Sequence, residues 1–401
     1  MKKPEILAPA GNFEKMKFAF EYGADAVYAA AEGFSLRSFA GNFKYEEMER
    51  AVEYAHGIGK KIYAAVNIYP RSFELEAAAK HLEFIGGIKA DGIIVSDLGM
   101  LSLVKKHAPK IPVHISVQAN NVNYEQIRMW KELGASRVIL ARELSIDEIT
   151  VIRKKVPEIE LEMFVHGAIC MSYSGRCLLS NYLTFRDANR GECTQPCRWN
   201  YTLEEKKRPG EHIPVFEDER GTYIFNSKDL RLIEKIPELV NAGIDSFKIE
   251  GRMKGISYAA VTSYAYKKAL NDFIAGKSFD PVLKEELETI SHREYTTGFV
   301  FDDKQAKQAY KSSDYISTAR FAGYVKEAGT ENECLIEAKH TIRINDSMEV
   351  FTPKGKIFTA EVQSIKNEEG EEFMHTKNQQ QYVLVLKTEN KIPEYSILRY
   401  R

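Results

Sequence analysis

The sequence of 401 residues lacks the features that define several large protein classes. It has no run of roughly eighteen apolar residues, which excludes an obvious membrane-spanning helix. No apolar stretch follows Met1-Lys2-Lys3-Pro4, so we expect no signal peptide, no membrane partner and a cytoplasmic protein. The net charge is only −1, so any nucleic acid would be bound by a local basic patch and not by bulk charge.

Familiar catalytic motifs are also absent. There is no H-E-x-x-H zinc helix, no G-x-S-x-G elbow, no P-loop and no glycine-rich dinucleotide fingerprint after a strand. Internal repeats and low-complexity segments are missing as well. Five cysteines are too few for a disulfide framework in a chain of this length, so we expect reduced thiols that are available for metal binding or chemistry.

What the chain does have is a regular alternation of short apolar runs and amphipathic stretches. The expected strands are residues 5–7, 26–28, 62–66, 92–95, 113–117, 137–140, 161–165 and 246–249. The expected helices are residues 13–21, 45–56, 75–84, 100–107, 124–133 and 146–156. This alternation is typical of βα units with a parallel sheet, and eight strands predict an α/β fold closed into a (β/α)₈ TIM-like barrel. An open doubly wound sheet is the alternative.

Breaks in the pattern predict the domain organisation. We expect the barrel at residues 1–275, with a cysteine-rich insertion at 166–230 and a helix at 230–241. Residues 276–316 form a helical or irregular linker in this interpretation. Residues 317–401 predict a small C-terminal all-β barrel, because β-branched and aromatic runs alternate with turn clusters. Its expected strands are residues 321–326, 334–338, 347–351, 356–365 and 382–386.

Polar residues follow nearly every expected barrel strand. The active face of such a barrel lies at the carboxyl ends of its strands. The residues in question include Asn12, Glu32, Asn67, Asp97, Gln118, Arg142, His166, Glu250 and Arg252. Loops are polar in general, but a complete ring of this kind favours a functional site. His166 is either a proton donor or a hydrogen-bonded loop histidine. The candidate catalytic residues are His166, Arg176, Glu250 and Arg252.

Four cysteines give the sharpest signal. Cys170, Cys177, Cys193 and Cys197 have the spacing C-x6-C-x15-C-x3-C, and Cys170 closely follows the seventh strand. Four thiolates bind either a [4Fe–4S] cluster or a structural zinc ion. Only Cys193 and Cys197 are spaced like a zinc knuckle, which favours the cluster. A third interpretation is that the four thiols are free or redox-active. Cys334 lies in an apolar run and is expected to be a buried small residue.

Arginines surround these cysteines. They are Arg176, Arg186, Arg190 and Arg198. Their guanidinium groups either pair with Asp187 and Glu192 on the surface, or offset the charge of the thiolates and bind an anionic substrate.

Several sequence blocks resemble peptidase family U32. They are EILAPAGN at 5–12, YGADAVY at 22–28, HGAIC at 166–170, YSGRC at 173–177, NRGEC at 189–193, QPCRW at 195–199, KIEGRMK at 248–254 and SHREY at 291–295. The small C-terminal unit also resembles a domain that many members carry. The resemblance implies that Cys170, Cys177, Cys193 and Cys197 are the ligands of an iron–sulfur cluster.

The family is named for collagenase-like proteolysis, yet its better-understood members resemble oxygen-independent hydroxylation factors. Separate branches act in ubiquinone synthesis, on ribosomal RNA and on tRNA. The chain length, the NRGEC block and the single C-terminal domain look most like the tRNA branch. That branch makes 5-hydroxyuridine at the wobble position, with prephenate implicated as a co-substrate.

Three functions therefore stand as hypotheses. The first is an enzyme that hydroxylates a wobble uridine, with the tRNA anticodon loop, and a U32-family paralogue, as partners. The splayed base would stack on Tyr173 or Trp199. The second is a peptidase that uses Cys170 or Cys177 with His166. The third is a zinc-stabilised barrel that binds RNA or a protein partner.

Overall fold

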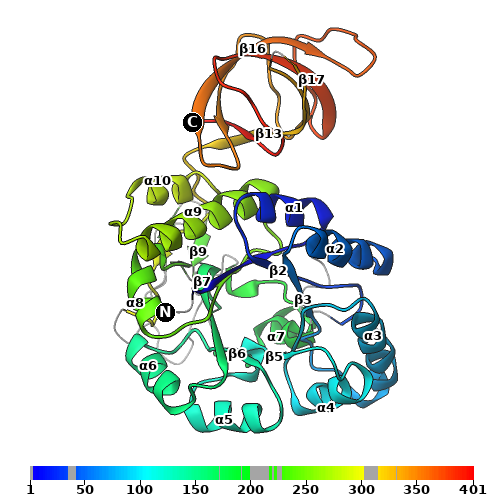
Figure 1. Ribbon diagram of the computed structural model, residues 1–401, viewed down its shortest axis with the longest axis vertical. Helices are drawn as coiled ribbons and strands as arrows, with labels where there is room; N and C mark the ends of the chain where they lie inside the picture. Colours follow the sequence, from blue (N-terminus) through cyan, green and yellow to red (C-terminus); the bar gives the residue numbers. More distant parts are fainter. Residues whose placement is uncertain are drawn as a thin grey trace.

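The computed structural model describes residues 3–34, 42–170, 172–190, 192–198, 216–218, 221–223, 228–301, 315–330 and 332–401. Two units are visible in Figure 1: a ring of parallel strands surrounded by helices, and a separate antiparallel barrel formed by the C-terminal part of the chain. Trp199, a predicted stacking residue, lies outside the described residues, as does the side chain of Arg198.

Eight parallel strands form the larger barrel. They are β1 (Glu5–Pro9), β2 (Ala26–Ala29), β3 (Lys61–Ala65), β4 (Gly92–Val95), β5 (Val113–Ile115), β6 (Arg137–Ile139), β7 (Glu160–Ala168) and β11 (Ser246–Ile249). Each pairs with the next, and β11 pairs with both β1 and β7, which closes the sheet on itself. The predicted TIM-like barrel is confirmed, and the open doubly wound sheet is wrong because β1 and β7 are joined through β11.

The six predicted helices are confirmed on the outside of the barrel. They are α1 (Phe13–Glu21), α2 (Tyr45–Gly57), α3 (Leu75–Gly87), α4 (Leu98–His107), α5 (Tyr124–Glu132) and α6 (Ile146–Lys155). Side chains in the loops between strands and helices cap several of them: Asn12, Asp97, Asn123 and Ser145 each accept a hydrogen bond from a backbone N–H three residues later. Polar residues at the barrel mouth therefore have a structural role in part, as helix caps.

Two more helices complete the ring, and one prediction is corrected. The helices are α8 (Ile236–Asn241) and α9 (Ile256–Ile274). The helix expected at 230–241 is only half right, because its first residues form strand β10 (Asp229–Arg231) and a short turn η5 (Ile233–Lys235). β7 extends beyond the barrel wall and offers backbone groups there, and β10 pairs antiparallel with it, Leu230 opposite Gly167. Tertiary pairing thus overrides the local helical pattern.

The segment 276–316, expected as a linker, contributes to both neighbouring units. It contains α10 (Val282–Glu288) and the two-residue strand β12 (Tyr295–Thr296). β12 pairs in parallel with β10 and so extends the sheet of the larger barrel. No helix in the described part of the chain is long and apolar enough to cross a membrane.

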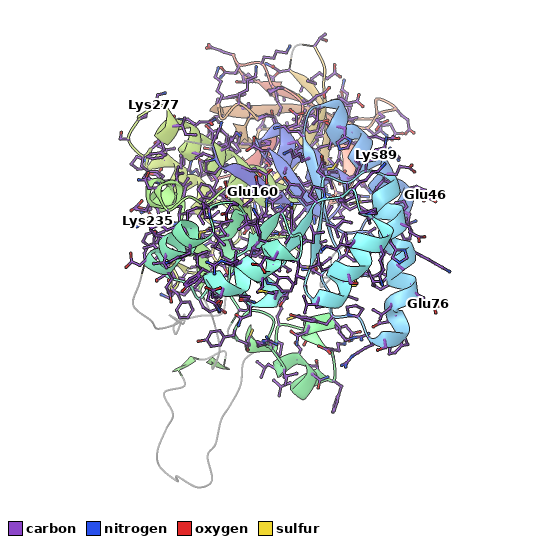
Figure 2. The ribbon with its side chains drawn as sticks, turned by 60° about the horizontal axis from the view of Figure 1, so that its bottom comes forward. Glu46, Glu76, Lys89, Glu160, Lys235 and Lys277 are labelled. Carbon is purple, nitrogen blue, oxygen red and sulfur yellow. The ribbon has the colours of Figure 1, made fainter. Side chains whose placement is uncertain are left out.

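The cysteine-rich insertion follows β7 at the carboxyl ends of the strands. Its described elements are α7 (Leu179–Thr184), η3 (Ala188–Arg190), η4 (Pro196–Arg198) and the paired strands β8 (Phe216–Asp218) and β9 (Gly221–Tyr223). In Figure 2 the barrel mouth points downward: Glu76 marks the first turn of α3, and the pale green α7 lies below it. The insertion therefore lies over the mouth of the barrel.

The C-terminal unit is a closed barrel of six antiparallel strands, as predicted for this part of the chain. Its strands are β13 (Arg320–Ala328), β14 (Glu333–Ala338), β15 (Ser347–Phe351), β16 (Ile357–Lys366), β17 (Gln380–Lys387) and β18 (Ile397–Tyr400). The sequence pattern missed β18, which joins β13 to β15 and closes the barrel. This strand is only four residues long and contains Arg399, whose guanidinium is buried against Glu286 of α10, 2.8 Å away.

The two barrels share a buried interface on α1 and α9. The hydroxyl of Tyr22 donates to the carbonyl oxygens of Phe351 at 2.7 Å and Tyr395 at 3.0 Å. The ring of Phe18 packs edge-on against Tyr324 and Tyr395. The small barrel is therefore attached to the outer helical layer, beside α1 and α9 in Figure 1.

Candidate functional site

A cavity of about 160 Å³ lies at the carboxyl ends of the barrel strands. Inward-facing side chains of the barrel form one side of it, including Tyr28, Phe164 and Lys248. Loops after the strands add further residues, including Asn67, Gln118, Arg142, Glu250 and Arg252. Five members of the predicted polar ring therefore reach one cavity.

All four cysteines of the predicted set line this cavity. They are Cys170, Cys177, Cys193 and Cys197. None forms a disulfide; the first is exposed and the other three are half-buried. Cys170 follows β7, Cys177 precedes α7, and the last two lie near η4. The structure thus brings together thiols that are separated by up to twenty-seven positions in the sequence.

Hydrogen bonds within the insertion hold these thiols in place. The amide of Asn189 donates to the carbonyl oxygen of Cys177 at 2.9 Å. The hydroxyl of Ser180 lies 3.8 Å from the sulfur of Cys193 and accepts a hydrogen bond from the backbone N–H of Thr194. Each half of the cysteine pattern is therefore tied to a polar residue of α7 or η3.

Contacts with three barrel loops fix the insertion over the mouth. Arg190 forms an ion pair with Glu74, in the turn η1 (Ser72–Glu74) that follows β3, at 2.7 Å. The backbone N–H of Ser174 donates to Glu143 after β6, at 2.9 Å. Gly175 has φ +74°, and a Cβ atom there would lie 2.0 Å from the carbonyl oxygen of Gln118. Only glycine permits that approach.

Four thiolates in a protein hold either a single zinc ion or a [4Fe–4S] cluster. Among the described residues, no three His, Cys, Asp or Glu side chains are arranged as ligands of a single metal ion. One zinc ion requires every sulfur within about 2.3 Å of a common point. A [4Fe–4S] cluster binds each thiolate to a different iron atom, so its ligands surround a larger volume. Four thiols that line one cavity supply the donors that either group requires.

The cavity wall carries excess positive charge. Arg142, Lys248 and Arg252 line it, and Glu250 is the one acidic residue among the described residues of the lining. The guanidinium of Arg142 lies 3.9 Å from the ring centre of Phe164. Buried or aromatic-stacked cations of this kind attract carboxylates and phosphates. The cavity therefore suits an anionic ligand.

Lys248 is the most buried of these cations. Its ammonium lies 2.7 Å from Glu162 and 4.5 Å from the ring centre of Tyr28. Burial lowers the pKa of Lys248 from its usual value, and the neighbouring Glu162 opposes that shift. Lys248 was not among the predicted site residues. The available signal was a lysine inside an otherwise apolar barrel strand, which is unusual unless the side chain has a partner.

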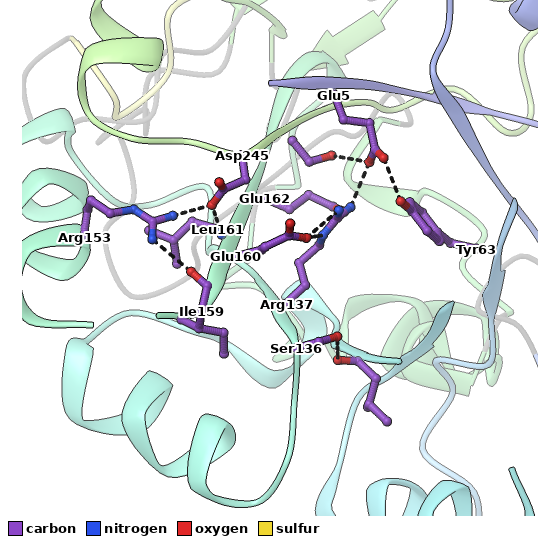
Figure 3. A network of polar contacts seen from close by, with 12 residues as sticks. Glu5, Tyr63, Ser136, Arg137, Arg153, Ile159, Glu160, Leu161, Glu162 and Asp245 are labelled. Atoms are coloured by element: carbon purple, nitrogen blue, oxygen red, sulfur yellow. Dashed lines mark hydrogen bonds and ion pairs between the residues drawn. The ribbon is translucent and has the colours of Figure 1, made fainter. Parts of the chain in front are cut away.

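A network of charged residues supports Lys248 from inside the barrel. Figure 3 shows Arg137 between Glu5, Glu160 and Glu162. The guanidinium of Arg137 lies 3.0 Å from the second oxygen of Glu162, which is fully buried. Glu162 thus lies between two cations and holds Lys248 in position on the cavity wall.

His166, a predicted proton donor, does not line the cavity. Its ring is buried against Tyr258 and Tyr266 of α9, between barrel and helices. The reason is a bulge: β11 pairs Lys248 with Phe164 but Ile249 with His166, so Val165 is an extra residue in β7. In a regular strand without the bulge, His166 would point to the same inner face as Phe164, because side chains two residues apart share a face. Burial lowers the pKa of His166 to about 3, so the ring is neutral near pH 7.

The other predicted residues divide between the cavity and the surface. Glu250 and Arg252 line the cavity, and Arg252 donates a hydrogen bond to the side chain of Asn42. Arg176 is exposed and does not belong to the lining. Cys334 is buried in the small barrel, as expected, and burial raises the pKa of its thiol to about 11.

A wider groove of about 830 Å³ adjoins the cavity. It shares Arg142, Cys170 and Tyr173 with the cavity and continues past the start of α6 to Phe299 and Phe301. Tyr173 is 65% exposed, so its ring is accessible where groove and cavity meet. The groove offers a route from solvent to the cysteines.

Comparison with known proteins gives consistent matches. The model of peptidase family U32 matches residues 11–310, and the model of its C-terminal domain matches residues 317–399. The tRNA hydroxylation protein P of Escherichia coli is 41% identical over 92% of this chain and 91% of its own length. The tRNA hydroxylation protein P1 of Bacillus subtilis is 37% identical over 99% of this chain and 95% of its own length. A 23S rRNA 5-hydroxycytidine synthase of Escherichia coli is 34% identical over 67% of this chain and 40% of its own length.

Proposed function

Because this chain belongs to peptidase family U32, and relatives similar over most of its length are named tRNA hydroxylation proteins, we propose that it is an enzyme that hydroxylates tRNA. The observation that carries the proposal is the cavity at the barrel mouth, where four thiols and three cationic side chains meet. A tRNA substrate supports the expectation that the reaction takes place in the cytoplasm.

The specific reaction we propose is conversion of the wobble uridine to 5-hydroxyuridine. Cys170, Cys177, Cys193 and Cys197 would hold a [4Fe–4S] cluster, which supplies redox or Lewis-acid chemistry beside the reacting carbon. The rest of the cavity wall consists of aromatic, amide, hydroxyl and aliphatic side chains. The cysteine spacing supports a cluster more than the zinc alternative, since only Cys193 and Cys197 are spaced like a zinc knuckle.

The cations of the cavity would bind an anionic co-substrate. Arg142, Lys248 and Arg252 lie on its wall, and a dicarboxylate such as prephenate offers two groups for them to pair with. Lys248 is held by Glu162 and so is already oriented before a ligand arrives. Glu250 follows the same strand and lines the cavity as well, which makes it the candidate to accept a proton there.

The target base would reach the cavity through the adjoining groove. A wobble base lies in a single-stranded loop and can be turned out of its stack. Tyr173 is exposed at the junction of groove and cavity, in a position to stack on that base. A U32-family paralogue is a further candidate partner, because it would act on tRNA as this protein does.

The peptidase alternative lacks support from the geometry. A thiol nucleophile needs a histidine within hydrogen-bond reach, about 2.6–3.2 Å. His166, the candidate base, packs against Tyr258 and Tyr266 and does not belong to the cavity lining that contains the cysteines.

The test is deletion of the gene in a strain without other family members, followed by mass spectrometry of its tRNA nucleosides. We expect 5-hydroxyuridine derivatives to disappear and to return with the wild-type gene. The Cys193→Ser gene should not restore them, whereas Cys334→Ser, a change of a buried cysteine far from the cavity, should do so. Nucleosides that stay unchanged on deletion would refute the proposal.

A further inference from the structure

Several large apolar side chains near the cysteine cavity are exposed to solvent, and no other part of the described fold covers them. Phe73 is 82% exposed in the turn η1 after β3, and Phe185 is 92% exposed at the end of α7. Leu178, at the start of α7, is 70% exposed. Among the described residues, five large apolar side chains are at least 65% exposed: these three and Tyr173 lie on the mouth side of the barrel, and Met374 lies in the small barrel.

Phe185 is in an unfavourable position by two independent measures. Its ring is almost fully exposed to water, and its backbone is left-handed, with φ 59°. A bulky residue other than glycine is disfavoured in that conformation. Neither core packing nor backbone preference accounts for phenylalanine here, and this points to a binding role for the ring.

Phe73 and Phe185 belong to one connected rim. The ion pair between Arg190 and Glu74 joins the insertion, which carries Phe185, to the turn that carries Phe73. In the same loop as Phe73, the hydroxyl of Tyr69 donates to the carbonyl oxygen of Gln118 after β5, against which Gly175 of the insertion also packs. The rings therefore project from loops that are fastened to each other beside the cavity.

Cationic side chains alternate with these rings along the chain. Arg71 precedes Phe73, Arg186 follows Phe185, and Arg176 lies between Tyr173 and Leu178; all three arginines are exposed. The acidic side chain nearest to Phe185 in the sequence, Asp187, accepts a hydrogen bond from the backbone N–H of Asn189, 2.9 Å away in the insertion itself. Aromatic rings interleaved with guanidinium groups form the surface that binds single-stranded nucleic acid, through base stacking and phosphate contacts.

We propose that Phe73 and Phe185 form a stacking platform for the nucleotides that flank the base in the cavity. The occupant is a single-stranded RNA loop, because the exposed arginines complement phosphate charge and the rim is continuous with the thiol-lined cavity. That this loop belongs to a tRNA rests on the proposed function. Binding to the platform needs no reaction and is measurable without one.

The experiment measures binding of a fluorescent anticodon stem–loop RNA to the full chain, purified without air, by anisotropy. Phe73→Ala and Phe185→Ala should each weaken binding about 5- to 100-fold. Phe185→Trp should bind as the wild type does, because it keeps a stacking ring. Phe185→Leu should be as weak as the alanine variant, because it keeps apolar area but not the ring. The control is Met374→Ala, which removes a side chain that is 72% exposed between β16 and β17 of the small barrel.

Two kinds of result would overturn the stacking platform, one from RNA binding and one from sedimentation. Alanine variants that bind RNA like the wild type, or a leucine variant that does so, would overturn the platform. Sedimentation of the protein alone provides a second readout: a dimer that Phe185→Ala dissociates would identify the rim as an interface between copies and overturn the RNA assignment. If deletion of the gene abolishes 5-hydroxyuridine but the variants bind normally, only the platform fails. If the variants lose binding while deletion leaves tRNA unchanged, only the proposed function fails.

Discussion

The ammonium of Lys248 lies 2.7 Å from the carboxylate of Glu162 where the barrel interior meets the cysteine-lined cavity. Glu162 is fully buried, and its other oxygen lies 3.0 Å from Arg137. One carboxylate therefore offsets two cations, Lys248 facing the cavity and Arg137 deep in the barrel; Figure 3 shows the Arg137 side of this arrangement. The arrangement connects the stability of the barrel with the charge of the site.

Substitutions at this pair should separate the two roles. Glu162→Gln leaves Lys248 without its buried partner and weakens the hold on Arg137, so we expect a loss of about 3–5 kcal/mol in the free energy of unfolding. Lys248→Met should cost less, because Glu162 keeps Arg137 as its partner, yet it should reduce tRNA hydroxylation at least tenfold through the lost cavity charge. Urea denaturation and nucleoside analysis measure the two effects. A Lys248→Met variant that is less stable than Glu162→Gln would contradict this.

The cysteines should determine the metal content. Wild-type protein purified without air should contain about four iron and four sulfide per chain, as expected for a [4Fe–4S] cluster. Serine at 170, 177, 193 or 197 should each lower the iron content several-fold, while Cys334→Ser, in the core of the small barrel, should leave it unchanged. Iron, sulfide and zinc analysis provides the measurement. One zinc ion per chain with no iron would instead favour the zinc-stabilised binding protein.

His166 should make stability depend on pH. Its folded-state pKa is about 3, against about 6.5 in an unfolded chain. Between these values only the unfolded state binds the proton, so the stabilising contribution is complete above about pH 6.5 and is lost as pH falls toward 3. His166→Phe should reduce the fall in unfolding free energy between pH 7 and pH 5 by about 2 kcal/mol. His375→Gln, at an exposed position, is the control. Parallel curves for His166→Phe and wild type would disprove the argument.

Tyr22 should contribute to the attachment of the small barrel. Tyr22→Phe removes the hydroxyl that donates to the carbonyl oxygens of Phe351 and Tyr395, and leaves these acceptors in a buried interface. We expect a loss of about 1–3 kcal/mol in unfolding free energy. Tyr54→Phe, on the neighbouring helix α2, is the matched control and should cost less than half as much. Differential scanning calorimetry would detect the change, and equal stability of the two variants would show that these hydrogen bonds contribute nothing.

The sequence by itself determined the order and type of most elements. The strands of the larger barrel and six of its helices were predicted within a few residues, because apolar periodicity and helix caps are local signals. The cysteine spacing, together with the position of Cys170 after the seventh strand, was sufficient to expect the four thiols at the mouth. The polar ring was predicted for the same reason, although Asn12 and Asp97 serve as helix caps and do not line the cavity.

Only the tertiary structure decided which polar side chains face the cavity. An extra residue at Val165 turns His166 outward against α9, and a bulge leaves no mark in a period-two pattern. Lys248 lies before this register shift and faces inward, where its cost of burial is offset by Glu162, an acid from another strand. Strand β10 likewise depends on its pairing with the distant strand β7. Local sequence fixes periodicity and backbone preference, but burial and ion pairing depend on residues that meet only when the barrel closes.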